Sequence, residues 1–204
     1  MTRHLILLFL ILLISTYSKG QKVLDNYVSV DSLRSLQFKM LNDSTIEFST
    51  IWKHMQPVMR VVYKAAKTDT TITIKYNQSR GADTQQNGII IKLLDFTENL
   101  ILTKIDGGFI DLANSIIYVR QKDFGENPKL AYIVDGKTYF QDNGKTDGYG
   151  LLKVMPKKNR PLQRKLKGLS IHDCNIEIFK GGLETYKKFG IKYVYGVIVI
   201  KTYK

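Results

Sequence analysis

The sequence is poor in the residues that build disulfide-bonded and zinc-binding domains. Among its 204 residues there are only one Cys and three His. A single thiol excludes an intramolecular disulfide framework and any zinc site that takes two or more cysteines from the same chain. We therefore interpret Cys174 as a small buried apolar side chain and not as a nucleophile. No metal and no cofactor is expected.

Proline and acidic residues are scarce as well. With 4 Pro, 44% hydrophobic and 24% charged residues, the composition excludes a disordered or collagen-like chain and is typical of one sizeable buried core. The chain carries 18 Asp and Glu against 31 Lys and Arg, which gives a formal net charge of +13. An electrostatic field of this sign attracts anions of any kind.

The only long apolar run lies at the N-terminus. Arg3 and His4 precede an unbroken apolar run over residues 5–14, and polar residues follow it. This order is typical of a secretory signal peptide, and a run of this length spans only about half of a ~30 Å hydrocarbon core. We predict a signal peptide over residues 1–20, with cleavage before Gln21. The mature chain is expected to be periplasmic, outer-membrane associated or secreted, with no transmembrane segment.

The predicted mature chain stays strongly basic. Loss of Arg3 and Lys19 lowers the number of Lys and Arg from 31 to 29 against 18 acids, which leaves a formal charge of +11. Outside the cytoplasm such a chain meets lipid head groups, lipopolysaccharide phosphates, acidic glycans and acidic protein faces. We expect one of these as the partner. Nucleic acid is not expected to be a partner, because the chain is exported.

The cations are concentrated between Asp147 and Asp173, where the sequence holds no acidic residue. Two interpretations stay open for this stretch. It is either a solvated connection punctuated by Pro156 and Pro161, or a patch that binds an anion or an acidic partner. The candidate contact residues are Lys153, Lys157, Lys158, Arg160, Arg164, Lys165 and Lys167.

Residues 21–127 are predicted to form a β-rich module. Short runs of β-branched and aromatic residues are separated by turn formers, as in an antiparallel sheet that is curled or doubled on itself. The runs over 33–40 and 45–52, joined by the turn residues 42–44, predict a hairpin, whereas residues 77–87 predict a loop. The other predicted strands are 58–63, 70–76, 88–94, 99–105 and 116–120.

Beyond Pro128 the pattern changes to strands mixed with one short helix. Leu183, Tyr186 and Phe189 recur at helical spacing before Gly190, a residue typical of the end of a helix. We therefore predict an α+β fold, in which a β-rich module is followed by a small α+β unit over residues 128–204. Its predicted strands are 131–134, 137–140, 176–179 and 195–202, with a tight turn at Asp135-Gly136 and a loop over 142–150.

Motifs for catalysis are weak. Gly136-Lys137 and Gly144-Lys145 resemble the end of a phosphate-binding loop but lack its first glycine, and the sequence has no Gly-x-Ser-x-Gly elbow. We interpret His54 and His172 as surface or capping residues, and Trp52 as an anchor in the core or at its rim. No catalytic, cofactor-binding or metal-binding residue is assigned. A site assembled from residues that are scattered along the sequence stays open.

Four segments in the last third of the chain combine strand-like runs with glycine-containing turns. Residues 131–136 are Ala-Tyr-Ile-Val-Asp-Gly, residues 175–182 are Asn-Ile-Glu-Ile-Phe-Lys-Gly-Gly, residues 186–190 end in Phe-Gly, and residues 195–202 are Tyr-Gly-Val-Ile-Val-Ile-Lys-Thr. Together they resemble the plug domain of TonB-dependent outer-membrane receptors, over about residues 128–204. The plug-like motif consists of Asp135, Gly136, Lys180, Gly181, Gly190 and Gly196.

This resemblance implies a plug-like fold and a location in the Gram-negative cell envelope. In the receptors a long transport barrel follows the plug, whereas this sequence stops at Lys204, so we expect no transport activity. Residues 192–195 also stand where the receptors carry a Gly-Ala-Asn run, and no box for contact with TonB is found near Gln21. The matched residues have structural explanations as turns and close backbone approaches.

Two functions stay open. The first is a non-enzymatic exported envelope protein whose plug-like module binds another envelope protein, such as an outer-membrane receptor, or an anionic lipid or glycan surface. The alternative is a small secreted hydrolase or glycan-acting enzyme, which needs two carboxylates that face each other across a cleft. The sequence favours the first, because it contains no assembled catalytic motif.

Overall fold

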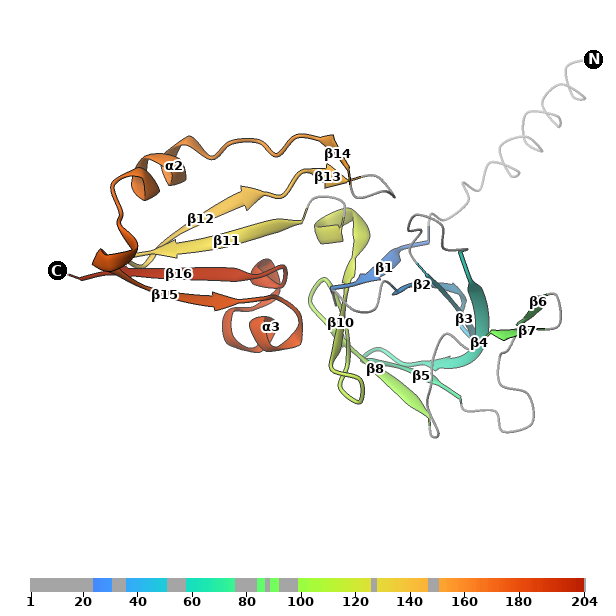
Figure 1. The fold of residues 1–204 in the computed structure, drawn as a ribbon. Helices are drawn as coiled ribbons and strands as arrows, with labels where there is room; N and C mark the ends of the chain where they lie inside the picture. Colours follow the sequence, from blue (N-terminus) through green and yellow to red (C-terminus); the bar gives the residue numbers. More distant parts are fainter. Residues whose placement is uncertain are drawn as a thin grey trace, which may run out of the picture.

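Strands dominate the structure. The computed structural model describes residues 24–30, 36–50, 58–75, 84–86, 89–91, 99–125, 128–146 and 151–203. Figure 1 shows two units side by side: an N-terminal barrel of strands, and a C-terminal sheet accompanied by short helices.

The N-terminal unit is a closed antiparallel barrel. Each barrel strand pairs with the next one in chain order, and β1 pairs with β10 to close the barrel. A separate hairpin of β6 (Thr84–Gln86) and β7 (Ile89–Ile91) lies between β5 and β8 in the chain. The barrel strands are β1 (Asn26–Ser29), β2 (Leu36–Asn42), β3 (Thr45–Thr50), β4 (Arg60–Lys67), β5 (Thr71–Ile74), β8 (Leu100–Ile105), β9 (Gly108–Asp111) and β10 (Ile116–Arg120).

The spacing of apolar residues places one side of each strand inside the barrel. In β4, Val61, Tyr63 and Ala65 are buried, while the residues between them are exposed. In β5, Ile72 and Ile74 are buried and alternate with half-buried threonines. A period of two matches the pleat of a strand, so these segments form strands whose apolar side faces inward.

Aromatic rings fill the barrel. The ring centroid of Phe38 lies 5.0 Å from that of Tyr27, 5.3 Å from Phe48, 5.6 Å from Phe109 and 5.1 Å from Tyr118. An eight-stranded barrel is just wide enough for side chains to fill its interior. The barrel is therefore a packed core that can serve as a scaffold.

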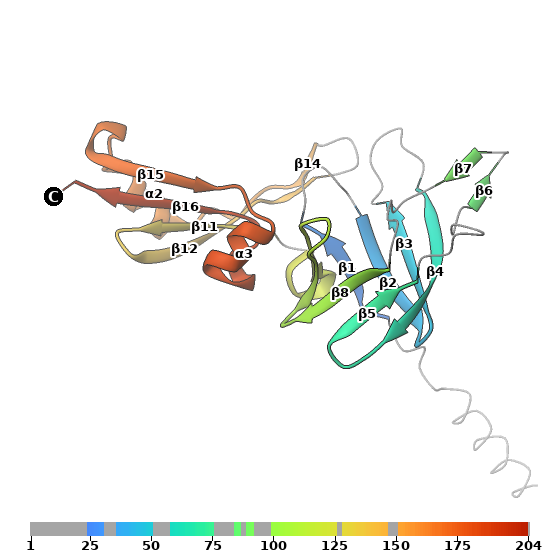
Figure 2. The ribbon, with the colours of Figure 1, turned by 90° about the horizontal axis from the view of Figure 1, so that it is seen from below.

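Strand β10 is buried on both faces and joins the two units. Ile116 and Tyr118 belong to the barrel core, whereas Ile117 and Val119 belong to a second apolar cluster. Figure 2 shows α3 (Leu183–Phe189) at the end of the C-terminal sheet that faces the barrel. Burial of apolar area between the units stabilises their contact. The second cluster contains Val28, Ile110, Ile117 and Val119 from the barrel and Leu183 and Val194 from the C-terminal unit.

The C-terminal unit is built on a mixed sheet of four strands in the order β12, β11, β16, β15. β11 runs parallel to β16, and the two outer pairs are antiparallel. β13 and β14 form a separate two-stranded ribbon. The elements are η1 (Gln121–Gly125), β11 (Lys129–Val134), β12 (Lys137–Asp142), β13 (Lys145–Thr146), β14 (Leu152–Val154), α2 (Arg160–Lys167), η2 (Ile171–Asp173), β15 (Cys174–Phe179), α3, η3 (Ile191–Tyr193) and β16 (Val197–Thr202).

The α+β class predicted from the sequence is wrong. Most of the secondary structure is strand, and a closed antiparallel barrel replaces the predicted arrangement of a β-rich module followed by an α+β plug-like unit. The helices α2 and α3 have only 8 and 7 residues. The hydrophobic period identifies single strands but not the closure of a barrel, because β1 and β10 lie at opposite ends of that module.

Individual elements agree with the sequence more closely than the fold class does. β2 and β3 form the predicted hairpin, with its turn at Asp43 and Ser44. The loops predicted over 77–87 and 142–150 are corrected in part, because β6 and β13 lie within them. The stretch interpreted as a solvated connection contains α2. β1 and β9 were not predicted as strands, and each has only 4 residues.

Some predictions fall on parts of the chain that the structure does not describe. The signal peptide over residues 1–20, Trp52 and His54 all lie outside the described residues. Within the described ranges, no helix has the length and apolar character needed to cross a membrane.

Candidate anion-binding surface

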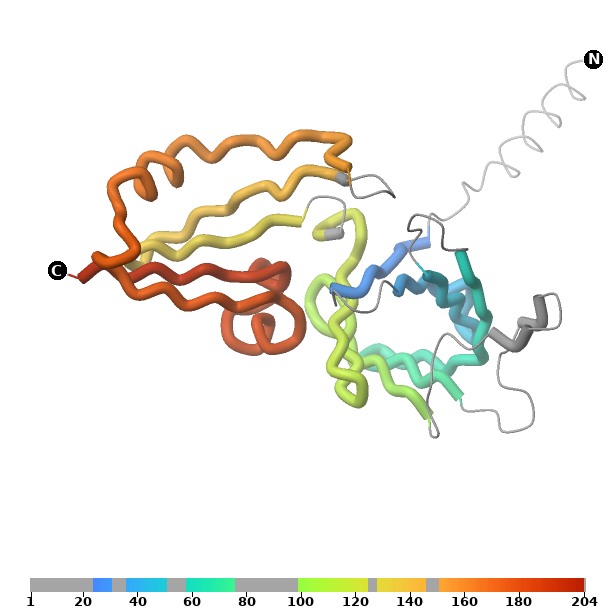
Figure 3. The backbone as a smooth tube through the Cα atoms, in the orientation of Figure 1, coloured from blue at the N-terminus to red at the C-terminus, as the bar shows by residue number. Residues whose placement is uncertain are grey.

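Residues 151–167, which we call the basic edge, run along one side of the C-terminal sheet. Figure 3 shows this segment in orange beside β12, from β14 to α2. Gln141 of β12 holds its extended part: its Nε2 donates to the carbonyl oxygen of Lys157 at 2.8 Å, and its Oε1 accepts from the backbone nitrogen of Asn159 at 3.3 Å. These hydrogen bonds fix the backbone of the segment against the strand.

Asn159 begins helix α2. Its Nδ2 donates to the carbonyl oxygen of Phe140 at 3.0 Å, and its Oδ1 accepts from the backbone nitrogen of Leu162 at 3.0 Å. An Asn cap followed by a proline in the first turn is typical of a helix start. Leu162 is buried in a cluster with Val134 and Ile200 of the sheet. The apolar side of the helix therefore faces the sheet, and its opposite side faces solvent.

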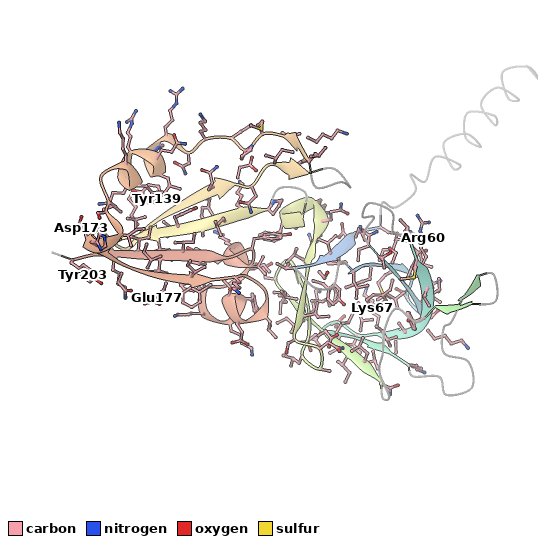
Figure 4. All side chains as sticks on the ribbon, viewed as in Figure 1. Arg60, Lys67, Tyr139, Asp173, Glu177 and Tyr203 are labelled. Carbon is pink, nitrogen blue, oxygen red and sulfur yellow. The ribbon has the colours of Figure 1, made fainter. Side chains whose placement is uncertain are left out.

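The solvent side of α2 is cationic. Arg160, Arg164 and Lys167 are separated by four and three residues, which places them on one helix face opposite Leu162. All three cations are exposed. Figure 4 shows nitrogen-tipped side chains that project away from the sheet along this edge of the molecule.

Six of the seven predicted contact residues form no ion pair with any described residue. Lys165 is the exception, because its Nζ lies 3.1 Å from Oδ2 of Asp135. Unpaired cations on one segment create a positive potential that extends about 8 Å into solution at physiological salt. The six exposed cations without an ion pair to a described residue are Lys153, Lys157, Lys158, Arg160, Arg164 and Lys167.

Large apolar side chains are exposed where the basic edge begins. The exposed fractions are 68% for Leu151, 51% for Leu152, 51% for Val154 and 73% for Met155. The whole of β14 is exposed on both of its faces, because Lys153 between its two apolar residues is exposed too. Contiguous exposed apolar residues with a polar rim often mark an interaction site. The basic edge thus combines cations with apolar side chains.

Asp135 and the four glycines of the predicted plug-like motif lie at turns, close backbone approaches or element ends. Asp135 and Gly136 form the turn between β11 and β12 with φ angles of 48° and 80°, as the sequence predicts for a tight turn. Gly181 has a φ of 97°, and a Cβ atom there would lie 2.8 Å from the carbonyl oxygen of Val194. The remaining members are the exposed Lys180, Gly190 at the end of α3, and Gly196 before β16.

Asp135, Asp25 and Tyr195 are three of the ionisable groups with shifted pKa values, and each shift favours the charge state found near neutral pH. A backbone hydrogen bond from Thr202, and then the contact with Lys165, lower the pKa of Asp135 from its ordinary value of 3.8. A hydrogen bond from Lys122 is the main cause that lowers the pKa of Asp25. Burial raises the pKa of Tyr195 to about 12, so its hydroxyl stays protonated. All three groups make structural contacts.

Asp111 of the barrel and Asp25, which precedes β1, are also held by structural partners. Asp111 is fully buried and accepts hydrogen bonds from the backbone nitrogen and the side chain of Asn114, at 3.0 and 2.8 Å. Asp25 lies 2.7 Å from Nζ of Lys122. Among the residues that the structure describes, no group of three or more His, Cys, Asp and Glu is placed to hold a metal ion. The hydrolase alternative stays a prediction.

Two single-residue predictions are tested by the structure. Cys174 is buried, and its Sγ donates to the carbonyl oxygen of Ser170 at 3.2 Å, which confirms the interpretation as a small core residue. His172 is exposed in η2, which confirms a surface position.

The exposure of Leu151, Leu152 and their neighbours was not predicted. Four of the five residues over 151–155 are apolar, a composition that does not predict exposure.

No family model, no curated protein and no solved structure matches the chain.

Proposed function

We propose that this protein is a non-enzymatic binding protein of the cell envelope that attaches to an anionic surface through the basic edge. One observation carries the proposal: six exposed cations, unpaired within the described part of the chain, lie on a segment whose backbone is fixed to β12. Such a row concentrates positive potential on one side of the molecule. It would both attract an anionic surface and orient the protein on it.

Other observations support an exported scaffold. The signal-peptide pattern of residues 1–20 supports export, and the resemblance of residues 128–204 to receptor plug domains supports an envelope location. The barrel supports a scaffold role, because aromatic side chains such as Phe38 and Tyr118 occupy its interior.

The test compares two variants of equal net charge. In the edge variant, Lys157, Lys158 and Arg160 are replaced by Gln. In the barrel variant, the exposed residues Lys64, Lys67 and Lys104 are replaced by Gln. Both are prepared as the chain from Gln21 onward, which holds every described residue, and are eluted with salt from an anionic matrix. We expect the edge variant to elute at clearly lower salt, because local charge density sets the contact.

Equal elution of the two variants would contradict the proposal, since only net charge would then matter. The wild-type chain and the edge variant are also used to capture partners from a solubilised Gram-negative envelope at low and high salt. If the wild-type chain retains anionic lipid or glycan and the edge variant does not, the result supports attachment to an anionic surface. A single acidic protein with the same behaviour would replace the surface with a protein partner.

A further inference from the structure

We infer that the surface bound by the basic edge is an anionic phospholipid bilayer, and that the apolar residues at the start of the edge enter its interface. This inference rests on the proposed function and specifies its partner. The residues concerned, which we call the apolar tip, are Leu151, Leu152, Val154 and Met155.

The apolar tip and the cations are interleaved along the chain. Lys153 lies between Leu152 and Val154 in β14, and Lys157 and Lys158 follow Met155 after one proline. All of these except the proline are exposed. A bilayer interface offers phosphate groups at its surface and hydrocarbon within a few ångströms below, so it binds apolar side chains and lysines that lie side by side.

The geometry of β14 favours a bilayer over a flat protein face or a polyanion. Leu152 and Val154 occupy one face of the strand and Lys153 the other, and all three are exposed. A bilayer interface suits both faces, because Leu152 and Val154 can enter the hydrocarbon while the long side chain of Lys153 reaches the head-group phosphates. An acidic glycan or polyphosphate would contact the lysines but would leave the apolar side chains unburied.

The first test measures binding to vesicles. Vesicles of phosphatidylglycerol and phosphatidylcholine in equal parts are sedimented with the chain from Gln21 onward, and vesicles of phosphatidylcholine alone are the comparison. The chain without residues 1–20 is used because the apolar run over 5–14 would itself bind lipid. We expect binding to the anionic vesicles, and weak binding to the neutral ones.

A matched pair of variants isolates the apolar contribution. The tip variant replaces Leu152 and Val154, each 51% exposed, with Thr. The control variant replaces Val62 and Ile101 of the barrel, which are 48% and 51% exposed, with Thr. We expect the tip variant to bind anionic vesicles about tenfold more weakly than wild type, because it loses apolar area that enters the bilayer. The control variant is expected to bind within about twofold of wild type.

A second measurement reports insertion directly. In a Cys174→Ala background, a bimane label is attached to Met155→Cys or, as a control, to Ile101→Cys. We expect anionic vesicles to shift the emission of the label at position 155 to shorter wavelength and to protect it from iodide, with no change at position 101. Unchanged fluorescence at position 155 while the protein is bound would overturn insertion.

The inference and the proposed function fail in distinguishable ways. If the edge variant elutes from the anionic matrix at lower salt than the barrel variant, but the wild-type chain does not bind the anionic vesicles, the lipid inference is wrong and the proposed function stands. If the tip variant binds vesicles as well as wild type does, the inference is wrong as well. If the edge variant elutes with the barrel variant, the proposed function itself is wrong.

Discussion

Asp135 and Thr202 are joined by two hydrogen bonds, although 67 residues separate them in the sequence. Oδ1 of Asp135 accepts from the backbone nitrogen of Thr202 at 2.9 Å and from its hydroxyl at 3.0 Å. The other carboxylate oxygen lies 3.1 Å from Nζ of Lys165. One carboxylate thus links the β11–β12 turn to the end of β16 and to α2. Helix α2 carries three of the six unpaired cations of the basic edge.

Replacement of Asp135 by Asn is expected to make the free energy of unfolding vary less with pH in the acidic range. The folded-state pKa of Asp135 lies below 3.8, so the charged carboxylate stabilises the fold above about pH 4, and this contribution is lost as the pH falls through the folded-state value. At pH 7 we expect the Asn variant to unfold at lower urea concentration than wild type. The difference should shrink as the pH falls below 4.

Asp69→Asn is the control, because Asp69 lies in the exposed turn between β4 and β5. Its urea midpoint should stay close to that of wild type at each pH. A difference between wild type and the Asp135 variant that stays constant from pH 7 to pH 3 would contradict the electrostatic role of Asp135.

Phe38→Ala is expected to destabilise the barrel strongly. The Phe38 side chain is 1% exposed and contacts four other rings, so its removal leaves a cavity in the packed interior. Such changes cost about 3–5 kcal/mol of unfolding free energy. Val62→Ala on the outer face of β4 should cost no more than about 0.5 kcal/mol. Urea unfolding measures both. A barrel with a solvent-filled interior would show a small effect at Phe38.

Two glycines are expected to respond oppositely to Ala. A Cβ atom at Gly108 would clash with the carbonyl oxygen of Tyr118 in the neighbouring strand β10. Backbone must move to relieve this clash, and we expect Gly108→Ala to cost about 1–3 kcal/mol or more. Nothing lies within 4 Å of a Cβ at Gly168. Gly168→Ala should leave the melting temperature unchanged or slightly raised. Equal effects at both sites would contradict the close pairing of β9 and β10.

Leu183→Ala tests the contact between the two units. Leu183 is 5% exposed and belongs to the cluster that joins α3 to the outer face of the barrel. We expect a loss of about 2–5 kcal/mol in unfolding free energy. Lys187→Ala on the same helix removes only an exposed ion pair with Glu184 and should cost about 0–1 kcal/mol. If Leu183→Ala lowers the free energy of unfolding by less than about 1 kcal/mol, the contact between the two units contributes little to stability.

Local chemistry made part of this fold predictable. The Asp135-Gly136 turn could be predicted because a tight hairpin needs positive φ angles, and Gly and Asp accept them at low cost. The strand predicted over 70–76 contains β5, where Ile72 and Ile74 are buried on one face because a strand has a period of two. Closure of the barrel through β1 and β10 was not predictable, since it is a pairing between distant segments.

The basic edge shows a different limit of sequence analysis. Its cations were identified from composition, but α2 was missed because Pro161 was interpreted as a breaker, although proline fits the first turn of a helix. Only Leu162 and Leu166 form its apolar side, which is a short signal. The exposure of Leu152 and Val154 depends on what packs nearby, and no local pattern contains that information.

The most direct test of the proposed attachment is a footprint of lysine reactivity. The chain from Gln21 onward is acetylated briefly, with and without inorganic polyphosphate, and each lysine is quantified by mass spectrometry. The account predicts that polyphosphate protects Lys153, Lys157, Lys158 and Lys167 of the basic edge several-fold more than Lys64, Lys67 and Lys104 of the barrel. Equal protection of the two groups, or stronger protection of the barrel lysines, would contradict it.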